Sequence, residues 1–371
     1  MLIKALNILD FRRYDDVSLQ FGNGTNILYG ENGAGKTTIL EAIHCLAYTR
    51  SFKTHLDSNL LRHGSDRYHL KGEFLGGDGH VREVRLDVEP GKHKQLRIDG
   101  RSITSRAEVI GRFPLVSLTP EDSEITFGSP EVRRQFVNKL FSQVDTRYMD
   151  HLQDYQRVLK QRNAMLSGYA NHGRRVDEIL LRSLDEQMAA LALKIEQARQ
   201  EHFEHFKDLA YEAYNDLEHE KTLKMTLVHN IHSRDHLEED FLKQFAAARG
   251  EDLRKGITTR GPHRDLLKIF LDTKDIRRYG SQGEHKLILV ALKFAEGRFL
   301  ETFLREPPVF LLDDLFAELD VKRSLQIVES LQGAHQIFIT ATDLSDLRTH
   351  GLEIDNGSIK VFDAGKVMEN E

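Results

Sequence analysis

The chain has 371 residues, 40 % hydrophobic and 30 % charged, with a formal net charge of −6 at pH 7. This composition excludes a disordered chain and predicts two domains, or one domain with a large insertion. The negative charge excludes a global basic field for nucleic acid, so any DNA contact must rest on a local patch. The single cysteine, Cys45, excludes an internal disulfide and fits a reducing compartment. Because no signal peptide or membrane span is apparent, we expect a cytoplasmic protein without a membrane partner.

The N-terminal third of the chain shows α/β and then all-β patterns. Residues 25–29 form a short apolar strand candidate, and residues 37–48 follow with helical periodicity. Between residues 67 and 101, apolar residues alternate with polar ones. Turn sequences at 76–79 and 89–92 interrupt this alternation. An antiparallel β meander fits this pattern.

The middle of the chain is helical by pattern. Ser129 and Pro130 begin one helix, a second is expected at 148–166, and a long one runs from about 176 to 217 after a break at 171–173. Apolar residues at 4-3 spacing in the long helix fit either a short antiparallel coiled pairing or ordinary packing against neighbouring helices. These residues are Leu184, Met188, Leu191, Ile195 and Ala198.

Strands return after Arg260, at 266–271, 309–312 and 336–340, with helices between them, including one that Asp320 could cap. Because α/β patterns occur at both ends of the chain, the sequence predicts one split α/β domain, residues 1–118 and 256–371. The helical part, residues 119–255, is then an insertion into that domain.

The segment GENGAGKTT lies between the first predicted strand and helix and fits the phosphate-binding pattern G-x-x-x-x-G-K-[ST]. Glycines allow successive N–H groups to converge on phosphate oxygens, and the following helix N-terminus adds positive partial charge. Lys36 would neutralise the β and γ phosphate oxygens, and Thr37 would ligate Mg²⁺ through its hydroxyl. The expected nucleotide-binding residues are Gly30, Glu31, Asn32, Gly33, Ala34, Gly35, Lys36, Thr37 and Thr38.

A second acidic element follows the apolar strand 309–312. Asp313 and Asp314 stand at its C-terminal end, where parallel sheets bind ligands. Asp313 is the candidate metal ligand, and Asp314 is the candidate catalytic residue that orients or deprotonates the attacking water. A solvated acidic turn is the simpler interpretation, but the phosphate loop in the same chain favours a Mg²⁺-nucleotide site.

A third motif, Ser281–Gln–Gly–Glu284, begins an amphipathic helix. Serine at an N-cap with glutamate three residues later fits a capping box, which explains the segment without any ligand. The order of the three motifs, however, resembles that of ABC-type ATPases. In such proteins the serine-glycine segment binds the γ-phosphate held by a second subunit.

Several stretches resemble the RecF family of DNA repair proteins over nearly the whole chain. They are FRRY at 11–14, RSFK at 50–53, TPED at 119–122, SPEVRRQF at 129–136, YQRVLKQRN at 155–163, GPHRD at 261–265, GSQGE at 280–284 and LLDDLFAELD at 311–320. This resemblance implies an α/β fold: an ABC-type P-loop ATPase head with an antiparallel β subdomain and an inserted helical lobe. The chain departs from the family pattern at Arg13, Glu284 and Leu184, where asparagine, glutamine and tryptophan, respectively, are common in the family.

The resemblance also implies a function. It points to an ATP- and Mg²⁺-dependent homodimer that binds gapped or junction DNA, hydrolyses ATP slowly and helps load recombinase with a RecR-type mediator. Ser281, Gly283 and Glu284 would bind the partner subunit's nucleotide, and Asp320 would lie at the same interface. Arg12 is expected at the phosphate or adenine, and Thr340 or Thr342 at the γ-phosphate. No Q-loop glutamine is identifiable.

The DNA-contacting residues are the least defined by the sequence. The candidates lie after the phosphate-loop helix and in the basic segment 147–175, and the contacts should be to phosphates. The candidates are Arg50, Lys53, Arg157, Lys160 and Arg162. The GPHRD segment could bind DNA, touch nucleotide or anchor a sheet.

Two other functions fit the sequence less well than this one. The motor subunit of a transporter would not explain the helical insertion. A P-loop kinase or other small-molecule phosphotransferase would have no use for a serine-glycine segment that acts across subunits.

Overall fold

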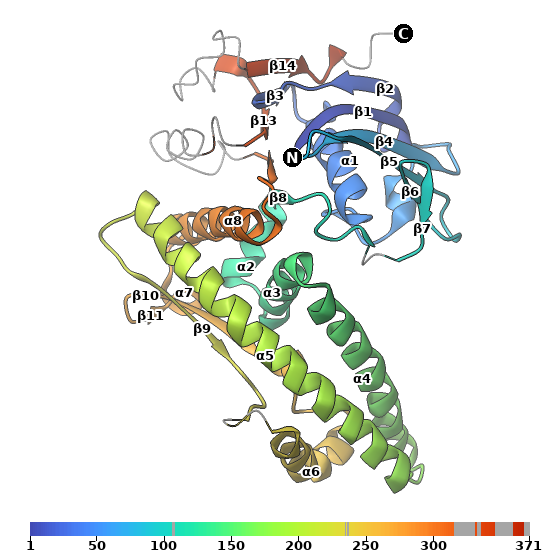
Figure 1. Cartoon of the computed structure of the whole chain (residues 1–371), viewed down its shortest axis with the longest axis vertical. Coiled ribbons are helices and arrows are strands. Elements are labelled where there is room, and N and C mark those ends of the chain that lie inside the picture. The colour runs from blue at the N-terminus through green and yellow to red at the C-terminus, as the bar shows by residue number, and fades with distance from the viewer. Residues whose placement is uncertain are drawn as a thin grey trace. The chain divides into compact units, whose positions relative to one another are not determined.

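The computed structural model describes residues 1–105, 108–233, 235, 237–314, 331, 335–345 and 359–366. The chain divides into two compact units. The first consists of Met1–Ser123, Ala213–Glu218 and Ser281–Glu371, and the second of Glu124–Glu212 and His219–Gly280. The blue N-terminal elements and the red C-terminal strands of Figure 1 therefore belong to the same unit. No described helix has the length and apolar content needed to cross a bilayer.

The first unit contains a six-stranded antiparallel sheet in the order β2-β1-β4-β5-β6-β7. Its last four strands confirm the predicted meander, and Gly79 and Gly91 adopt positive φ angles in the two predicted turns. The strands β1 and β2 were not predicted. The bounds are β1 Leu2–Phe11, β2 Tyr14–Gln20, β4 Tyr68–Leu75, β5 Val81–Val88, β6 Gln95–Ile98 and β7 Arg101–Ile103.

A second sheet of the first unit has five parallel strands in the order β14-β3-β13-β12-β8. Burial of β12 and β13 on both faces explains their continuous apolar sequences. Three of these strands were predicted within a residue of their ends. The bounds are β3 Thr25–Tyr29, β8 Leu115–Leu118, β12 Val309–Leu312, β13 Ile337–Ala341 and β14 Ile359–Asp363.

Two helices position the functional residues of the first unit. Helix α1 (Lys36–Tyr48) is buried along most of its length, in one apolar core that includes residues from both sheets. Helix α8 (Gln282–Leu304) packs on β12, where a Cβ added at Gly297 would lie 2.5 Å from the Phe310 ring. Only glycine allows this close approach of helix and strand.

The second unit contains six helices and a three-stranded antiparallel sheet among its described residues, in the strand order β11-β10-β9. The bounds are α2 Glu124–Phe127, α3 Pro130–Val144, α4 Thr146–His172, α5 Glu178–Leu217, β9 Leu223–Val228, α6 Glu238–Lys255, β10 Leu266–Leu271, β11 Lys274–Asp275 and α7 Ile276–Tyr279. The last turn of α5 belongs to the first unit. Three short 3₁₀ turns, Asp57–Leu60, Pro120–Ser123 and Pro262–Arg264, complete the named elements.

This division differs from the predicted domain boundaries at residues 119–123, 213–218 and 256–280, of which the last is the largest. The sequence predicts residues 256–280 in the split α/β domain because strands return after Arg260. The first of these strands, β10, instead pairs with β9 in register from Leu266 opposite Val228 to Leu271 opposite Leu223. The antiparallel partner precedes it in the chain, so the segment lies in the second unit.

The long helix α5 has a buried face that mixes apolar and charged residues. Leu184, Met188 and Ile195 are buried as the 4-3 spacing predicts, but Asp185 and Arg199 are buried beside them. Because charged side chains at a seam need specific partners, this composition favours ordinary packing over a coiled pairing.

Arg162 joins three helices of the second unit. Its guanidinium is 0 % exposed and donates to Asp185 on α5 at 2.8 Å and to Asp252 on α6 at 2.7 Å. Thr258 Oγ1 accepts a further bond at 2.9 Å. The prediction that Arg162 contacts DNA is therefore wrong for this fold, because the side chain is enclosed by its protein partners.

The GPHRD segment is an anchor of the second unit. Asp265 accepts hydrogen bonds from buried Arg199 and from the Asn230 N–H, the latter at 2.8 Å. His263 bonds the Tyr155 hydroxyl through Nδ1 at 2.9 Å, and burial lowers the pKa of this imidazole to about 4. Of the three roles considered for this segment, these contacts favour the anchoring one.

Arg162→Met is expected to destabilise the protein by about 3–5 kcal/mol, because it leaves two carboxylates buried without their partner. Arg157→Met is the matched control on the same helix. Its ion pair with Asp154 is solvent-exposed, so we expect a change below about 1 kcal/mol. Urea unfolding measures both variants, and equal stability of the two would contradict the structural role of Arg162.

Candidate nucleotide-binding site

The phosphate loop connects β3 to α1 and depends on its glycines. Gly30, Gly33 and Gly35 have φ angles of 142°, 82° and 103°. A Cβ added at Gly35 would lie 2.4 Å from the Tyr14 hydroxyl, so both backbone conformation and space require glycine there. The loop thereby keeps the N-terminus of α1 uncovered, with its free N–H groups directed at the pocket.

Lys36 is held inside the loop by main-chain oxygens. Its Nζ donates to the carbonyl of Gly30 and to that of Glu31, the second at 3.1 Å. Burial lowers the pKa of this ammonium, while Asp314 and Asp313 act in the opposite direction. The lysine therefore lies between the loop and two carboxylates, where a phosphate chain would find a positive charge.

Asp313 links the phosphate-loop helix to two parallel strands. Its Oδ1 accepts hydrogen bonds from the hydroxyls of Thr37 and Thr340, both at 2.9 Å. Burial raises the pKa of this carboxyl, and the two hydroxyl bonds lower it. Residues far apart in the chain meet here because β12 and β13 are adjacent parallel strands that end at the same edge.

The Thr37 and Asp313 oxygens suit Mg²⁺, a metal that takes few protein ligands besides water and phosphate. No group of three or more His, Cys, Asp or Glu side chains that could form a separate metal cage occurs in the described chain. A hydroxyl and one carboxylate beside the phosphate loop are thus the donor set expected for a nucleotide-bound magnesium ion.

Asp314 has a backbone conformation that directs its side chain differently. Its φ angle is 56°, its side chain is exposed in the pocket, and its N–H donates to Thr340 Oγ1 at 2.8 Å. Thr340 thus fixes both carboxylate residues. This geometry fits the expected division of labour, in which Asp313 faces the metal and Asp314 faces the attacking water.

These residues surround one pocket of about 790 Å³. Most of the predicted residues line it, while Gly30 and Glu31 contribute the carbonyls that hold Lys36. Thr340 is a pocket residue, and Thr342 is not. Lys53, a DNA candidate, also lies in this wall, and its charge lowers the pKa of Asp313. The predicted lining residues are Arg12, Asn32, Gly33, Ala34, Gly35, Lys36, Thr37, Thr38, Lys53, Asp313, Asp314 and Thr340.

One wall of the pocket was missed by sequence reasoning. The segment after α1 lies against the β1–β2 hairpin, because the Arg12 N–H donates to the Leu60 carbonyl at 2.8 Å and the Arg62 N–H to the Asp10 carbonyl at 3.0 Å. This segment carries no motif, so only its polar composition could have drawn attention. The missed residues are Ser58, Asn59, Leu61, Arg62, His63 and Ser65.

Arg12 is oriented by a carboxylate beneath it. Its Nε and Nη2 donate to the two oxygens of Glu41 at 2.9 and 2.8 Å, and Glu41 is 1 % exposed. The Ser51 hydroxyl donates to the same carboxylate. This bidentate support fixes the guanidinium plane at the pocket wall, in agreement with a nucleotide contact.

The Ser281 segment does not take part in this pocket. Ser281 Oγ accepts the Glu284 N–H at 3.3 Å, and Glu284 Oε2 accepts the Ser281 N–H at 2.7 Å, so the predicted capping box exists. Gly283 is exposed, and a Cβ added there would meet nothing within 4 Å. Packing within the described chain therefore gives no reason for glycine at this position. Asp320 lies outside the described residues.

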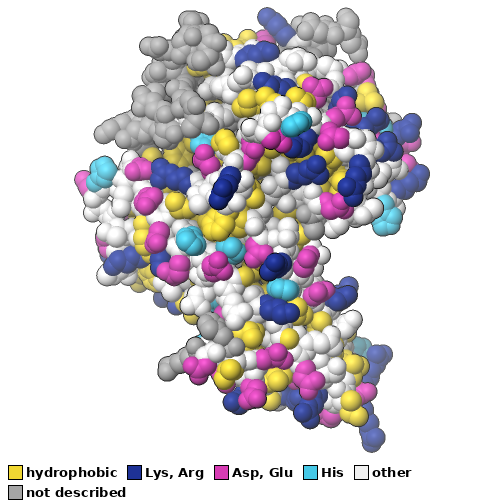
Figure 2. All heavy atoms as spheres, in the orientation of Figure 1, with side chains coloured by type: hydrophobic (Ala, Val, Ile, Leu, Met, Phe, Trp, Pro, Cys, Tyr) yellow, Lys and Arg dark blue, Asp and Glu magenta, His cyan; other side chains and the backbone are white. Residues whose placement is uncertain are grey.

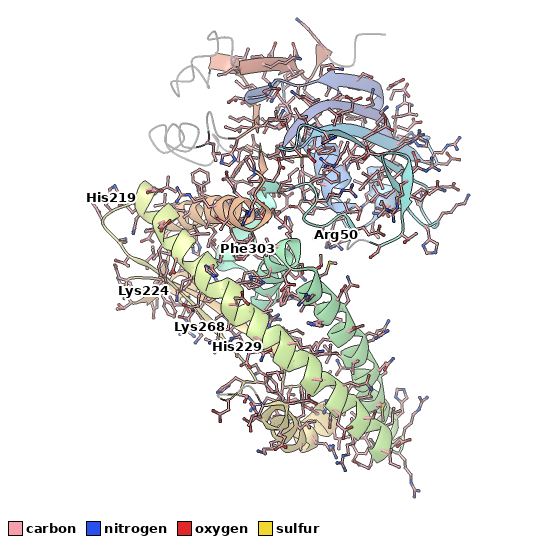
Figure 3. The ribbon with its side chains drawn as sticks, in the orientation of Figure 1. Arg50, His219, Lys224, His229, Lys268 and Phe303 are labelled. Carbon is pink, nitrogen blue, oxygen red and sulfur yellow. The ribbon has the colours of Figure 1, made fainter. Side chains whose placement is uncertain are left out.

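The remaining DNA candidates are exposed on both units. Arg157 and Lys160 are exposed on α4, and Arg50 is exposed just beyond the end of α1 (Figure 3). On the face that Figure 2 shows, basic and acidic side chains are interspersed, so no broad basic surface is visible there. Lys224 and Lys268 form a further cationic pair on one face of the β9–β10 ladder, diagonal to each other in the register (Figure 3).

Comparison with known sequences gives relatives that match more than nine tenths of the chain. A model described as the RecF/RecN/SMC N terminal domain matches residues 2–351. The chain is 33 % identical over 349 residues to the DNA replication and repair protein RecF of Chlorobaculum tepidum, with 92 % of this chain and 94 % of the relative covered. It is 34 % identical over 369 residues to RecF of Streptococcus gordonii, with 97 % and 100 % covered.

Comparison with solved structures gives the same fold. The structure of the recombination mediator protein RecF-ATP in the RecFOR pathway has a TM-score of 0.86 and 29 % identity, and 92 % of each chain is covered. The RecF-ATPrS structure has a TM-score of 0.88 and 28 % identity, with 98 % and 96 % covered. An Smc head domain from Pyrococcus furiosus, at TM-score 0.54 and 17 % identity, shows likeness of fold alone. The predicted fold class, an ABC-type ATPase head, is confirmed.

Asp314→Asn is expected to keep Mg-ATP affinity within about twofold and to lower hydrolysis by about 10²-fold or more, because the amide cannot take a proton from water. Asparagine tolerates the positive φ at this position, so the backbone is not strained. Asp313→Asn is the comparison, since it should weaken magnesium-dependent binding instead. Nucleotide titration and single-turnover hydrolysis separate the two, and normal turnover in Asp314→Asn would contradict its catalytic role.

Proposed function

The chain belongs to the RecF family of RecF/RecN/SMC ATPases, and on this premise we propose an ATP-switched, DNA-binding homodimer that acts in recombinational repair and replication. Its relatives are named DNA replication and repair proteins, and one solved relative carries ATP. The observation that carries the proposal is the geometry of Thr37, Asp313 and Thr340 beside the phosphate loop. These residues form the cis half of an ATP site.

The trans half of the site supports the dimer. Ser281 and Gly283 are exposed at the start of α8, yet neither residue lines the pocket of its own chain. A helix N-terminus binds anions through free N–H groups and the helix dipole. A second copy of the chain would supply the γ-phosphate to this helix tip, and Ser281 would contribute its hydroxyl.

Within this site each side chain has one task. Lys36 neutralises the phosphate chain, and Arg12, supported by Glu41, holds the nucleotide at the pocket wall. Thr37 and Asp313 hold Mg²⁺, which would supply charge neutralisation at the β and γ phosphates. Asp314 orients water and takes its proton. We expect slow hydrolysis that resets the dimer.

The DNA-binding and partner functions rest on family membership. One solved relative is named as a recombination mediator in the RecFOR pathway, which supports a RecR-type mediator as partner of this chain. Gapped or junction DNA is the substrate class expected for this activity, with contacts to phosphates. The transporter and phosphotransferase alternatives lose support, because the relatives match almost the entire chain, including the helical unit.

Ser281→Arg is expected to abolish ATP-dependent dimers, because its bulk and charge would occupy the space of the partner's phosphate, while ATP binding by the monomer persists. Ser281→Ala is the matched control. It loses the same helix cap, at a cost of about 0.5–2 kcal/mol, without adding bulk. Sedimentation with a slowly hydrolysed ATP analogue decides, and full dimerisation of Ser281→Arg would contradict the model.

DNA affinity is expected to fall with salt, with a slope of log affinity against log salt of about −0.9 per phosphate contacted. Lys160→Gln should reduce the magnitude of this slope by about one unit if Lys160 contacts a phosphate. Lys243→Gln is the control, because Lys243 already pairs with Asp240 at 3.4 Å. Anisotropy titrations of gapped DNA at several salt concentrations test this, and an affinity independent of salt would exclude phosphate-dominated binding.

A further inference from the structure

A buried charge cluster joins α8 to the turn that follows β8. Lys293 on α8 is 3 % exposed, and its Nζ lies 2.9 Å from Asp122 Oδ1 and 3.3 Å from Glu296 Oε2. Glu296 is 1 % exposed. All three residues belong to the first unit, and none of them lines the nucleotide pocket.

Such a cluster is an expensive way to pack a helix. Burying charges costs several kcal/mol per ion, and apolar side chains of similar volume often stabilise such a site better. Burial favours the neutral amine, but the two carboxylates raise the pKa of Lys293 above its usual value, so the ion pair is kept. Stability alone therefore does not account for the cluster, and the geometry that it imposes on its neighbours is its more specific effect.

Asp122 connects the cluster to the edge of the sheet that carries the metal ligand. Its Oδ2 accepts the N–H and the hydroxyl of Thr119 at 2.9 and 3.0 Å. Thr119 directly follows β8, and the preceding residue, Leu118, accepts the Asp313 N–H at 2.9 Å. One carboxylate thus ties Lys293 to the backbone that hydrogen-bonds to Asp313.

The other end of the path is the exposed tip of α8. Helix α8 begins at Gln282 after the Ser281 cap, and it packs on β12 through Gly297 and through the Phe294 ring, whose centroid lies 6.3 Å from that of Phe310. Because a helix is a rigid element, a rotation of α8 at Lys293 would also move its N-terminus. The tip is the part proposed to bind the partner's phosphate.

We propose that Lys293 and Asp122 are positioning residues that couple occupancy of the nucleotide pocket to the direction of the α8 tip. The inference rests on the proposed ATP-dependent dimer and adds the pair through which ATP binding in one subunit prepares its helix for the other. The Thr37 hydroxyl, now bonded to Asp313, is the group expected to turn toward Mg²⁺. The resulting adjustment at Asp313 reaches α8 through Leu118, Thr119 and Asp122.

The coupling has a reciprocal consequence. If ATP strengthens dimerisation through this pair, dimerisation strengthens ATP binding by the same factor, which for coupled sites is typically about 5- to 150-fold. A variant that breaks the pair should therefore lose two things together. Its dimers should weaken, and its ATP affinity should no longer rise with protein concentration.

The test compares Lys293→Met and Asp122→Asn with Arg298→Met. Arg298 lies on the same helix and pairs with Asp216 at 2.6 Å, but this pair is exposed and joins α8 to α5 instead of to the turn after β8. Mg-ATP affinity is measured by titration at protein concentrations where the chain is monomeric. The dimer constant is measured by sedimentation with the slowly hydrolysed ATP analogue, and circular dichroism with thermal unfolding reports folding.

We expect both cluster variants to bind Mg-ATP as monomers within about twofold of wild type and to weaken dimers by about 5- to 150-fold. Arg298→Met should behave as wild type in both measurements. Asp122→Asn keeps an acceptor for Thr119, so it decides the matter if Lys293→Met does not fold. Wild-type dimerisation in the cluster variants, or equal loss of monomer ATP binding and dimers, would overturn the inference. A wild-type chain that stays monomeric with the analogue would instead refute the proposed function.

Discussion

The carboxylate of Asp313, held by the hydroxyls of Thr37 and Thr340, is the contact on which the nucleotide site depends. It joins the first helix of the chain to strands formed from its last quarter. Because all five strands of this sheet are parallel, the ends of β3, β8, β12 and β13 lie at one edge, and each contributes to the site or to its support. The long interruption of the domain by the second unit is tolerated because this register, and not chain proximity, assembles the pocket.

Two helix N-termini give the first unit its proposed dual role. Helix α1 begins at the phosphate loop and directs its N–H groups into the pocket, whereas α8 begins at an exposed capping box outside the pocket. The positive end of a helix dipole favours anions at both N-termini, and we propose that the α8 tip uses it for a partner's phosphate. Placing them apart in one chain makes each copy a donor to a neighbour's site, which is the basis of the dimer that we propose.

Buried ion pairs are used differently in the two units. In the second unit, Arg162 and Arg199 tie helices and loops together through several carboxylates and carbonyls. In the first unit, the ion pair of Lys293 and Asp122 lies beside a well-packed apolar core. The contacts of Arg162 and Arg199 serve the structure of the second unit, whereas Lys293 and Asp122 form the proposed link between the pocket and the helix tip.

The sequence by itself determined the chemistry and most elements: the phosphate loop at Gly30–Thr37, the strand before Asp313, the β meander, the capping box and the family. These follow from local rules, since turn geometry, capping and periodicity need only neighbouring residues. Tertiary structure decided what depends on distant partners. The pairing of β10 with β9 moved residues 256–280 into the second unit, burial removed Arg162 from the DNA candidates, and the hairpin contacts of Leu60 and Arg62 formed a pocket wall without any motif. The sequence does not show whether a charged side chain is exposed to solvent or buried against a carboxylate. Only the packed structure distinguishes a surface charge from a buried one.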